Sequence, residues 1–173
     1  MWRLSSPMLS VWDPLVVEPD LRAVVGAFTD AGADFVLIGG FAVIAHEVLR
    51  TTEDCDLLIP DDATNDAAVF SAVRSLTATP QDGQPLSLEL ITQRESLRLS
   101  SDTSGMLDLL RGGLPPLDFA SVKATAIEGT LGELNFSIAG LPSLVAFKRL
   151  AGRAQDHADL EKLEQIHGPL PQV

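Results

Sequence analysis

The chain has little cysteine, no long apolar run and few basic residues, and each shortage excludes a class of protein. Its single cysteine, Cys55, excludes an internal disulfide and fits a reducing cytoplasm. No apolar run approaches the roughly 18–20 residues of a membrane-spanning helix. The N-terminal segment MWRLSSPMLSVWDPL lacks the basic region and sustained apolar stretch of a secretory signal. We therefore expect a cytoplasmic protein without a membrane partner.

Basic residues are outnumbered two to one, with 12 Lys and Arg against 24 Asp and Glu and a formal net charge of −12. This balance argues against a protein that coats nucleic acid electrostatically, although a local basic site is still allowed. Two groups of basic residues could form such a site: Arg94, Arg98 and Arg111 in the middle of the chain, and Lys148, Arg149 and Arg153 near its end. Bound divalent cations would offset part of an acidic pocket.

The remaining composition is that of a globular domain, with 46% hydrophobic and 21% charged residues over 173 positions. Residues 1–18 contain two prolines and no clear period, so we expect an N-terminal arm followed by a single domain at residues 19–173. Helices are expected at residues 18–33, 41–49 and 61–76, and as a pair within 142–167 that is broken near Gly152. Strands are expected at residues 34–40, 54–60, 86–92, 96–100 and 105–112, with one or two hairpins in 118–140. This order predicts an α+β fold, a mixed sheet flanked by helices and ending in a helical pair.

Two acids, Asp54 and Asp56, stand one residue apart at the start of what reads as a buried strand, DCDLLIP. Residues i and i+2 of a strand face the same way, so the two carboxylates would project side by side while Cys55 turns into the core. Buried charges need a partner, and paired carboxylates repel each other unless a cation lies between them. Hard oxygen ligands suit Mg²⁺, which also binds substrate phosphates.

A third acid from a neighbouring strand would complete a two-metal site for in-line phosphoryl or nucleotidyl transfer. Asp108 in GMLDLLRG is the first choice because it is an acid within an otherwise apolar strand, and Asp102 and Glu89 are weaker candidates. A structural or capping role for Asp108 is the alternative.

A glycine pair, Gly39 and Gly40, directly follows the first expected strand. Such a turn lets the backbone approach a phosphate and presents N–H groups at the start of the next helix. Alone, a glycine pair is more often a tight turn, and D-x-D pairs are common on solvated surfaces. The ordered combination of turn and acids is more specific than either part.

These residues carry a resemblance to a known family. LIGGFAVIAHEVLRTTEDCDLLI resembles the nucleotide-binding core of the nucleotidyltransferase superfamily, in particular the group related to AbiEii-type abortive-infection toxins. That group has a glycine turn, an Arg-x-Thr approach and a D-x-D pair in this order. The later segment LPSLVAFKRLAGRAQDHADLEKLEQI resembles the group's helix bearing Lys and its Arg-x-x-Asp-x-x-Asp-Leu run. The resemblance covers roughly residues 20–166 and is strongest at its two ends.

The resemblance implies a role for each matching residue. Gly39 and Gly40 would hold the triphosphate, and the metals would be bound by Asp54, Asp56 and Asp108. Lys148 would face the phosphates or position the attacking group. Arg50, before the D-x-D pair, matches as well, and so do Arg153, Asp156 and Asp159 in the end motif. Arg50, Arg153 and Asp156 would belong to the nucleotide-binding site together with Lys148, and the acids of the end motif would orient Lys148 or build the pocket wall. The chain departs from the pattern in having Gly40 where many active members have Ser.

The function implied is Mg²⁺-dependent transfer of a nucleoside monophosphate from an NTP to a tRNA or protein hydroxyl. The chain would then be the toxin half of a toxin–antitoxin pair, with a cognate antitoxin as partner. A second enzyme hypothesis is transfer to a small molecule, as in antibiotic adenylyltransferases, and a third is a non-catalytic nucleotide-binding or interaction module. Dinucleotide binding is disfavoured because no G-x-G-x-x-G occurs. For Lys148, the alternative is a solvated helix face.

Overall fold

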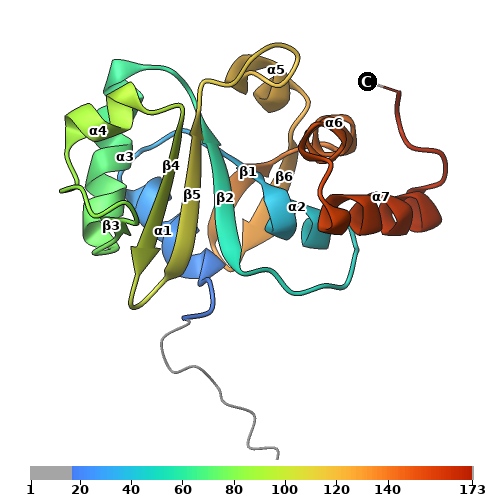
Figure 1. Ribbon diagram of the computed structural model, residues 1–173, viewed down its shortest axis with the longest axis horizontal. Helices are drawn as coiled ribbons and strands as arrows, with labels where there is room; N and C mark the ends of the chain where they lie inside the picture. Colours follow the sequence, from blue (N-terminus) through green and yellow to red (C-terminus); the bar gives the residue numbers. More distant parts are fainter. Residues whose placement is uncertain (1–16, 173) are drawn as a thin grey trace, which may run out of the picture.

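The computed structural model describes residues 17–172. The arm expected at residues 1–18 therefore lies almost wholly outside the described residues. Within them a mixed sheet forms the centre of the molecule (Figure 1). Its strands are β1 (Val36–Ile38), β2 (Asp54–Ile59), β3 (Thr79–Pro80), β4 (Ser96–Ser101), β5 (Gly105–Arg111), β6 (Ile127–Leu131) and β7 (Leu134–Ile138).

The strand order β3-β4-β5-β2-β1-β7-β6 places the two strands with acidic residues, β2 and β5, beside each other. β2 pairs in parallel with β5, and β1 in parallel with β7, whereas the other neighbours are antiparallel. The expected mixed sheet is confirmed.

Helices cover the sheet in two groups, which lie on opposite sides of the molecule in Figure 1. One group consists of α1 (Leu21–Asp30), α3 (Ala63–Ser75) and α4 (Leu88–Gln93), in which α3 packs against both others. The other contains α2 (Gly39–Ala45), α6 (Leu141–Ala151) and α7 (Ala154–His167), in which α6 packs against both others. A short helix, α5 (Phe119–Ala124), follows β5. The α+β architecture ending in a helical pair matches the sequence prediction.

The central strands are apolar because both of their faces are covered. Leu57 and Ile59 of β2 pack into the larger core cluster, together with residues of α1 and α3, whereas Leu58 packs into a smaller cluster with Val122 of α5. Asp54 and Asp56 share strand parity with Leu58, so they lie on the face of the smaller cluster. A strand buried on both faces reads as a continuous apolar run, and β2 departs from that pattern at its two acids.

One expected strand is a helix in the structure. Residues 86–92 contain most of α4, which Ser87 caps by accepting a hydrogen bond of 3.1 Å from Leu90 N–H. Leu90 and Ile91 are its buried residues. The alternation of apolar residues in this segment is typical of a strand. The Ser87 cap and the contact with α3 favour a helix instead.

The segment 118–140 begins with α5, capped by Asp118, and only its second part forms a hairpin, β6–β7. The two-residue strand β3 was not predicted. The expected break near Gly152 is confirmed, since this residue ends α6 in the left-handed conformation with φ 61°. No helix among residues 17–172 is both long and apolar enough to cross a membrane.

Candidate active site

Three carboxylates converge where β2 and β5 run side by side. Asp56 and Asp108 are direct partners in the parallel register, and Asp54 stands two residues before Asp56 on the same face. One carboxylate oxygen from each of the three lies within 4.8 Å of the other two, and all three residues are half-buried. The structure thus brings Asp108 to the D-x-D pair. The weaker candidates, Asp102 and Glu89, are exposed and lie outside this group.

The glycine turn lies against the same acids. Gly39 has φ 65°, and a Cβ built on it would come within 1.9 Å of Oδ2 of Asp56. A Cβ on Gly40 would be 2.3 Å from Oγ1 of Thr52. Both positions therefore require glycine in this arrangement, Gly39 for its conformation and its closeness to a carboxylate, and Gly40 for its closeness to Thr52. The glycine turn therefore lies next to the acids, as the sequence predicts.

The group of acids is electrostatically strained. Burial raises the pKa of Asp56 to about 6, and repulsion from Asp54 and Asp108 adds to the effect, against a hydrogen bond from Gly40 N–H and the charge of Lys148. Burial and the same three acids raise the pKa of Cys55, whose side chain turns into the core as predicted. Its thiol is therefore protonated and inert at neutral pH.

A residue that the sequence prediction left unassigned, Arg98 of β4, contacts two of the acids. Its Nε donates to Oδ1 of Asp108 at 2.8 Å, and its Nη2 donates to Oδ2 of Asp108 at 2.5 Å and to Oδ2 of Asp54 at 3.1 Å. The hydrogen bonds to Asp108 raise the pKa of the guanidinium, which is charged at every relevant pH. The signal was the alternation in SLRLS, which turns Arg98 away from Leu97 and Leu99, but the pairing of β4 with β5 was needed to find its partner.

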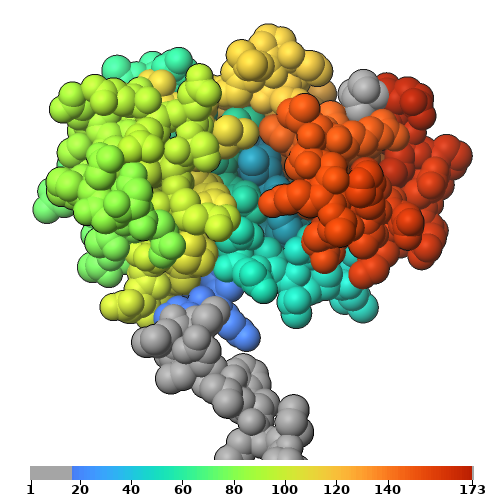
Figure 2. Space-filling model, in the orientation of Figure 1, coloured from blue at the N-terminus to red at the C-terminus, as the bar shows by residue number. Residues whose placement is uncertain are grey.

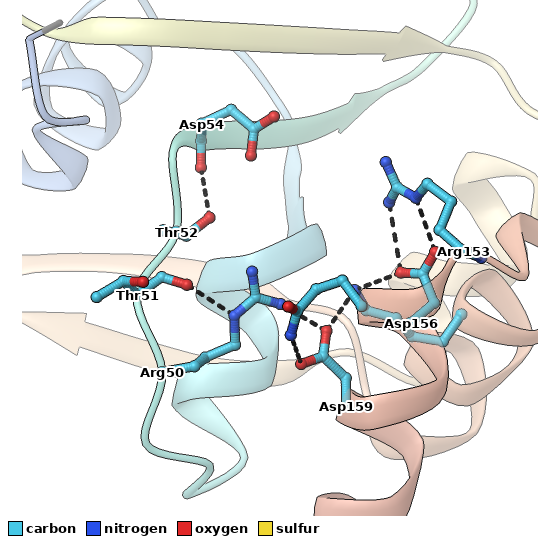
Figure 3. A network of polar contacts seen from close by, with 9 residues as sticks. Arg50, Thr51, Thr52, Asp54, Arg153, Asp156 and Asp159 are labelled. Atoms are coloured by element: carbon cyan, nitrogen blue, oxygen red, sulfur yellow. Dashed lines mark hydrogen bonds and ion pairs between the residues drawn. The ribbon is translucent and has the colours of Figure 1, made fainter.

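Lys148 of α6 lies in a buried ion network with Asp156 and Asp159 of α7. Figure 3 shows these two acids and the arginines around them. The Nζ of Lys148 is 2.8 Å from Oδ1 of Asp156 and 2.8 Å from Oδ2 of Asp159, and only 6% of the lysine side chain is exposed. The ammonium is thus held between two carboxylates and is not a solvated surface group. The implied role of Asp156 and Asp159 in orienting Lys148 agrees with these contacts.

Two arginines complete this network. Arg50, in the loop before β2, donates to Asp159, and its Nε donates to the Thr51 carbonyl at 2.8 Å. Arg153 stands at the start of α7 and donates through its backbone N–H and through Nε, at 3.1 and 2.7 Å, to Oδ2 of Asp156. Burial raises the pKa of Asp156, but the hydrogen bonds from Arg153 and Lys148 outweigh it and hold the pKa well below its usual range.

The loop that carries Arg50 and Thr52 joins the network to the acids. Thr52 Oγ1 donates to the Asp54 carbonyl at 3.1 Å, so the segment that carries Arg50 leads directly into the acid pair (Figure 3). In the space-filling view the surface is hollowed between β4–β5 on one side and α6–α7 on the other, with parts of α2 and β2 at its floor (Figure 2). Arg153, whose side chain is 74% exposed, is close enough for Asp56 and Asp54 to raise its pKa further.

The three carboxylates fit a divalent cation. They supply hard oxygen donors within one ion's reach of one another, and a bound cation would relieve the repulsion that raises the pKa of Asp56. Asp54, Asp56 and Asp108 are the residues that would hold Mg²⁺.

No family model and no curated protein matches the chain significantly. Its structure is similar to a lincosamide antibiotic adenylyltransferase, LnuA, bound to lincomycin, with a TM-score of 0.63 and 14% identity over 87% of this chain and 99% of that one. It is also similar to ANT(2'')-Ia in complex with adenylyl-2''-tobramycin, with a TM-score of 0.59 and 12% identity over 84% of this chain and 86% of that one. A solution structure of the same antibiotic-resistance factor matches with a TM-score of 0.58 and 12% identity over 84% of this chain and 80% of that one. The chain therefore has the fold of these antibiotic nucleotidyltransferases.

Proposed function

We propose that the protein is a cytoplasmic, Mg²⁺-dependent nucleotidyltransferase that transfers a nucleoside monophosphate from an NTP to a hydroxyl group and releases pyrophosphate. The observation that carries the proposal is the convergence of Asp54, Asp56 and Asp108 beside the Gly39–Gly40 turn. Residues 19–173 would form the single catalytic domain. The fold shared with known adenylyltransferases supports the same reaction class.

In this reaction the acceptor oxygen bonds to the α-phosphorus as the bond to the bridging oxygen breaks, and the electron pair leaves with pyrophosphate. The acceptor's proton is released to solvent. Bound Mg²⁺ would supply positive charge at the phosphoryl oxygens. Asp54, Asp56 and Asp108 would hold that charge in place. The Gly39–Gly40 turn brings the backbone close to these acids, because neither glycine carries a side chain that would meet Asp56 or Thr52.

The ion network has a positioning role in this proposal. The buried Lys148 lowers the pKa of Asp56 through its charge and ties α6 to α7 through Asp156 and Asp159. Arg50 joins the loop before β2 to the same network. Arg153, the most exposed of these cations, is the one we expect to contact the phosphates. The two carboxylates already engage the Lys148 ammonium, which leaves it a single N–H for any direct contact with a phosphate.

For the acceptor, we propose the hydroxyl of a small molecule. Two structures of similar fold hold an antibiotic or its adenylylated product. The net charge of −12 also disfavours a large polyanion as acceptor. Transfer to a tRNA or protein hydroxyl, with a cognate antitoxin as partner, is the second candidate. Its support is the resemblance of the end motif to the toxin group, whose matching residues Lys148, Arg153, Asp156 and Asp159 form one connected network here.

The test is a transfer assay with each labelled NTP and Mg²⁺. The acceptors are a panel of hydroxyl-bearing antibiotics, total tRNA and a cell extract, and an Asp54→Asn, Asp56→Asn variant serves as the inactive control. Metal-dependent label on a small molecule supports the proposal. Label on RNA or protein moves the assignment to the toxin-like reaction, and no transfer to any acceptor makes the chain a non-catalytic nucleotide-binding module.

A further inference from the structure

Arg98 holds a position that the proposed function does not explain. It is the register partner of Asp108 across β4 and β5, and its guanidinium binds both oxygens of that carboxylate and one oxygen of Asp54. Among the described residues, it is the cation that forms ion pairs with these two acids. One positive charge therefore sits on the carboxylates that would bind a metal.

The strand fixes the backbone position of Arg98, but it does not fix the position of the guanidinium. Leu97 and Leu99 on either side are buried in the core, so the Cα of Arg98 is held rigidly on the face that carries the acids. Its side chain is nevertheless 54% exposed, and the strand that carries it, β4, lies at one side of the hollow seen in Figure 2. The guanidinium can turn away from the acids without leaving water, so such a movement carries little desolvation penalty.

A metal ion and this guanidinium compete for the same oxygens. Magnesium binds through one or two carboxylates together with substrate phosphates, and a fork that uses both oxygens of Asp108 blocks that ligand. Arginine also matches phosphate geometry through the same planar fork. A metal–triphosphate complex therefore offers a new partner for the arginine at the same time as a new cation for the acids, whereas a free metal ion offers only the second.

We propose that Arg98 is an intramolecular counter-cation that occupies Asp108 and Asp54 until a metal–nucleotide complex binds, and that its guanidinium then turns to the phosphate oxygens. The inference rests on the proposed function and deepens it. Its consequence is selectivity: the site binds free divalent metal weakly and the metal–nucleotide complex well. Arg98 thus positions the triphosphate, and it weakens the binding of metal ions when no nucleotide is present.

The experiment measures Mn²⁺ binding to the full chain without nucleotide, by electron paramagnetic resonance of the free ion, for the wild type, Arg98→Gln and Arg98→Lys. Removing one charge-assisted carboxylate contact should tighten Mn²⁺ binding roughly 10- to 100-fold in Arg98→Gln. Arg98→Lys, which keeps the charge and loses the fork, should fall between. The matched control is Arg94→Gln, since Arg94 is 41% exposed and pairs with Asp82 away from the acids.

A second arm measures binding of a non-hydrolysable NTP analogue with Mn²⁺, which should weaken in Arg98→Gln by about tenfold or more. Thermal unfolding of each variant checks that it is folded. Equal Mn²⁺ affinity in Arg98→Gln and wild type would overturn the inference while leaving the proposed function intact. If neither protein binds Mn²⁺ with or without nucleotide, the metal site itself is wrong, and the proposed function falls together with the inference.

Discussion

When no cation is bound, the charged form of the Asp56 carboxylate is destabilised by its surroundings. Its folded pKa of about 6 lies above the ordinary value of 3.8 because of burial and the neighbouring Asp54 and Asp108. The folded state therefore binds more protons than the unfolded state between about pH 4 and pH 6, so stability falls as pH rises through that window. Above it, the charged Asp56 destabilises the fold unless a cation compensates.

Replacing Asp56 with Asn should accordingly raise the free energy of unfolding at pH 7 without metal, by roughly 1–3 kcal/mol. The same variant should lose the additional stability that Mg²⁺ gives the wild type. Urea unfolding with Mg²⁺ and with EDTA measures both effects. Asp30→Asn, at an exposed position near the end of α1, is the control and should change neither. A destabilised Asp56→Asn protein in EDTA would contradict the electrostatic interpretation.

The side chain of Thr52 occupies the space that a side chain at position 40 would need. Oγ1 of Thr52 stands 2.3 Å from where a Cβ on Gly40 would lie, so this chain has a steric reason for glycine, and not Ser, at this position. Gly40→Ser alone should destabilise the protein by about 1–3 kcal/mol through overpacking. In a Thr52→Gly background the added cost should largely disappear. A double-mutant cycle of thermal unfolding measures this coupling, and strictly additive losses would show that the two positions are independent.

At the residue scale the sequence predicted what strand parity alone determines. Asp54, Asp56 and the inward Cys55 follow from the period of two, and Asp108 from being an acid in an apolar strand. Arg98 could not be assigned in the same way. Its contact with Asp108 depends on the register of the β4–β5 hairpin, which the sequence prediction did not assign. Its contact with Asp54 depends on β2 lying beside β5, and strand neighbours far apart in the chain are set by tertiary packing, which no local pattern contains.

At the scale of elements, α6 and α7 are joined by buried ions as well as by apolar contacts. The pKa of Asp156 is held below its usual range despite burial, mainly by hydrogen bonds from Arg153 and Lys148. An acid with a depressed folded pKa adds stability above its unfolded pKa of about 4, and loses that contribution as pH falls toward its folded pKa.

Asp156→Asn should therefore destabilise the protein at pH 7 by about 3 kcal/mol, because it leaves the buried Lys148 with one carboxylate fewer. The difference from wild type should shrink as pH is lowered below about 4. Urea unfolding as a function of pH measures it. The control is Asp82→Asn, which removes a pair whose two side chains are about two-fifths exposed, 41% for Arg94 and 40% for Asp82, and should change stability little. An equal loss at all pH values would assign the effect to packing instead of charge.

The same scale explains the two elements that the sequence prediction assigned wrongly. Residues 86–92 alternate like a strand, but Ser87 and the contact between α3 and α4 select a helix. Asp118 likewise caps α5 in a segment that was expected to be hairpin. In both cases a single polar cap carried the information, and apolar periodicity in a short segment does not separate helix from strand.

Over the whole molecule, negative charge dominates, with a formal net charge of −12. The site that would receive the nucleotide contains three carboxylates close together, so a triphosphate without metal meets strong repulsion there. A metal ion without nucleotide meets Arg98. The two ligands should therefore bind cooperatively, each lowering the free-energy cost of binding the other.

This cooperativity predicts the response of global stability. Mg²⁺ and a non-hydrolysable NTP analogue together should raise the melting temperature more than the sum of their separate effects, since only the joint complex satisfies both the acids and Arg98. At a ligand concentration about 100 times the dissociation constant, the stabilisation should be about 2.7 kcal/mol. Differential scanning calorimetry with each ligand alone, with both, and with EDTA measures the three increments.

In the Asp54→Asn, Asp56→Asn variant the joint increment should vanish, because the cation that links nucleotide to protein is no longer held. Full stabilisation by the analogue in EDTA would instead show that the nucleotide binds through the basic side chains alone, and would remove the metal from the proposed site.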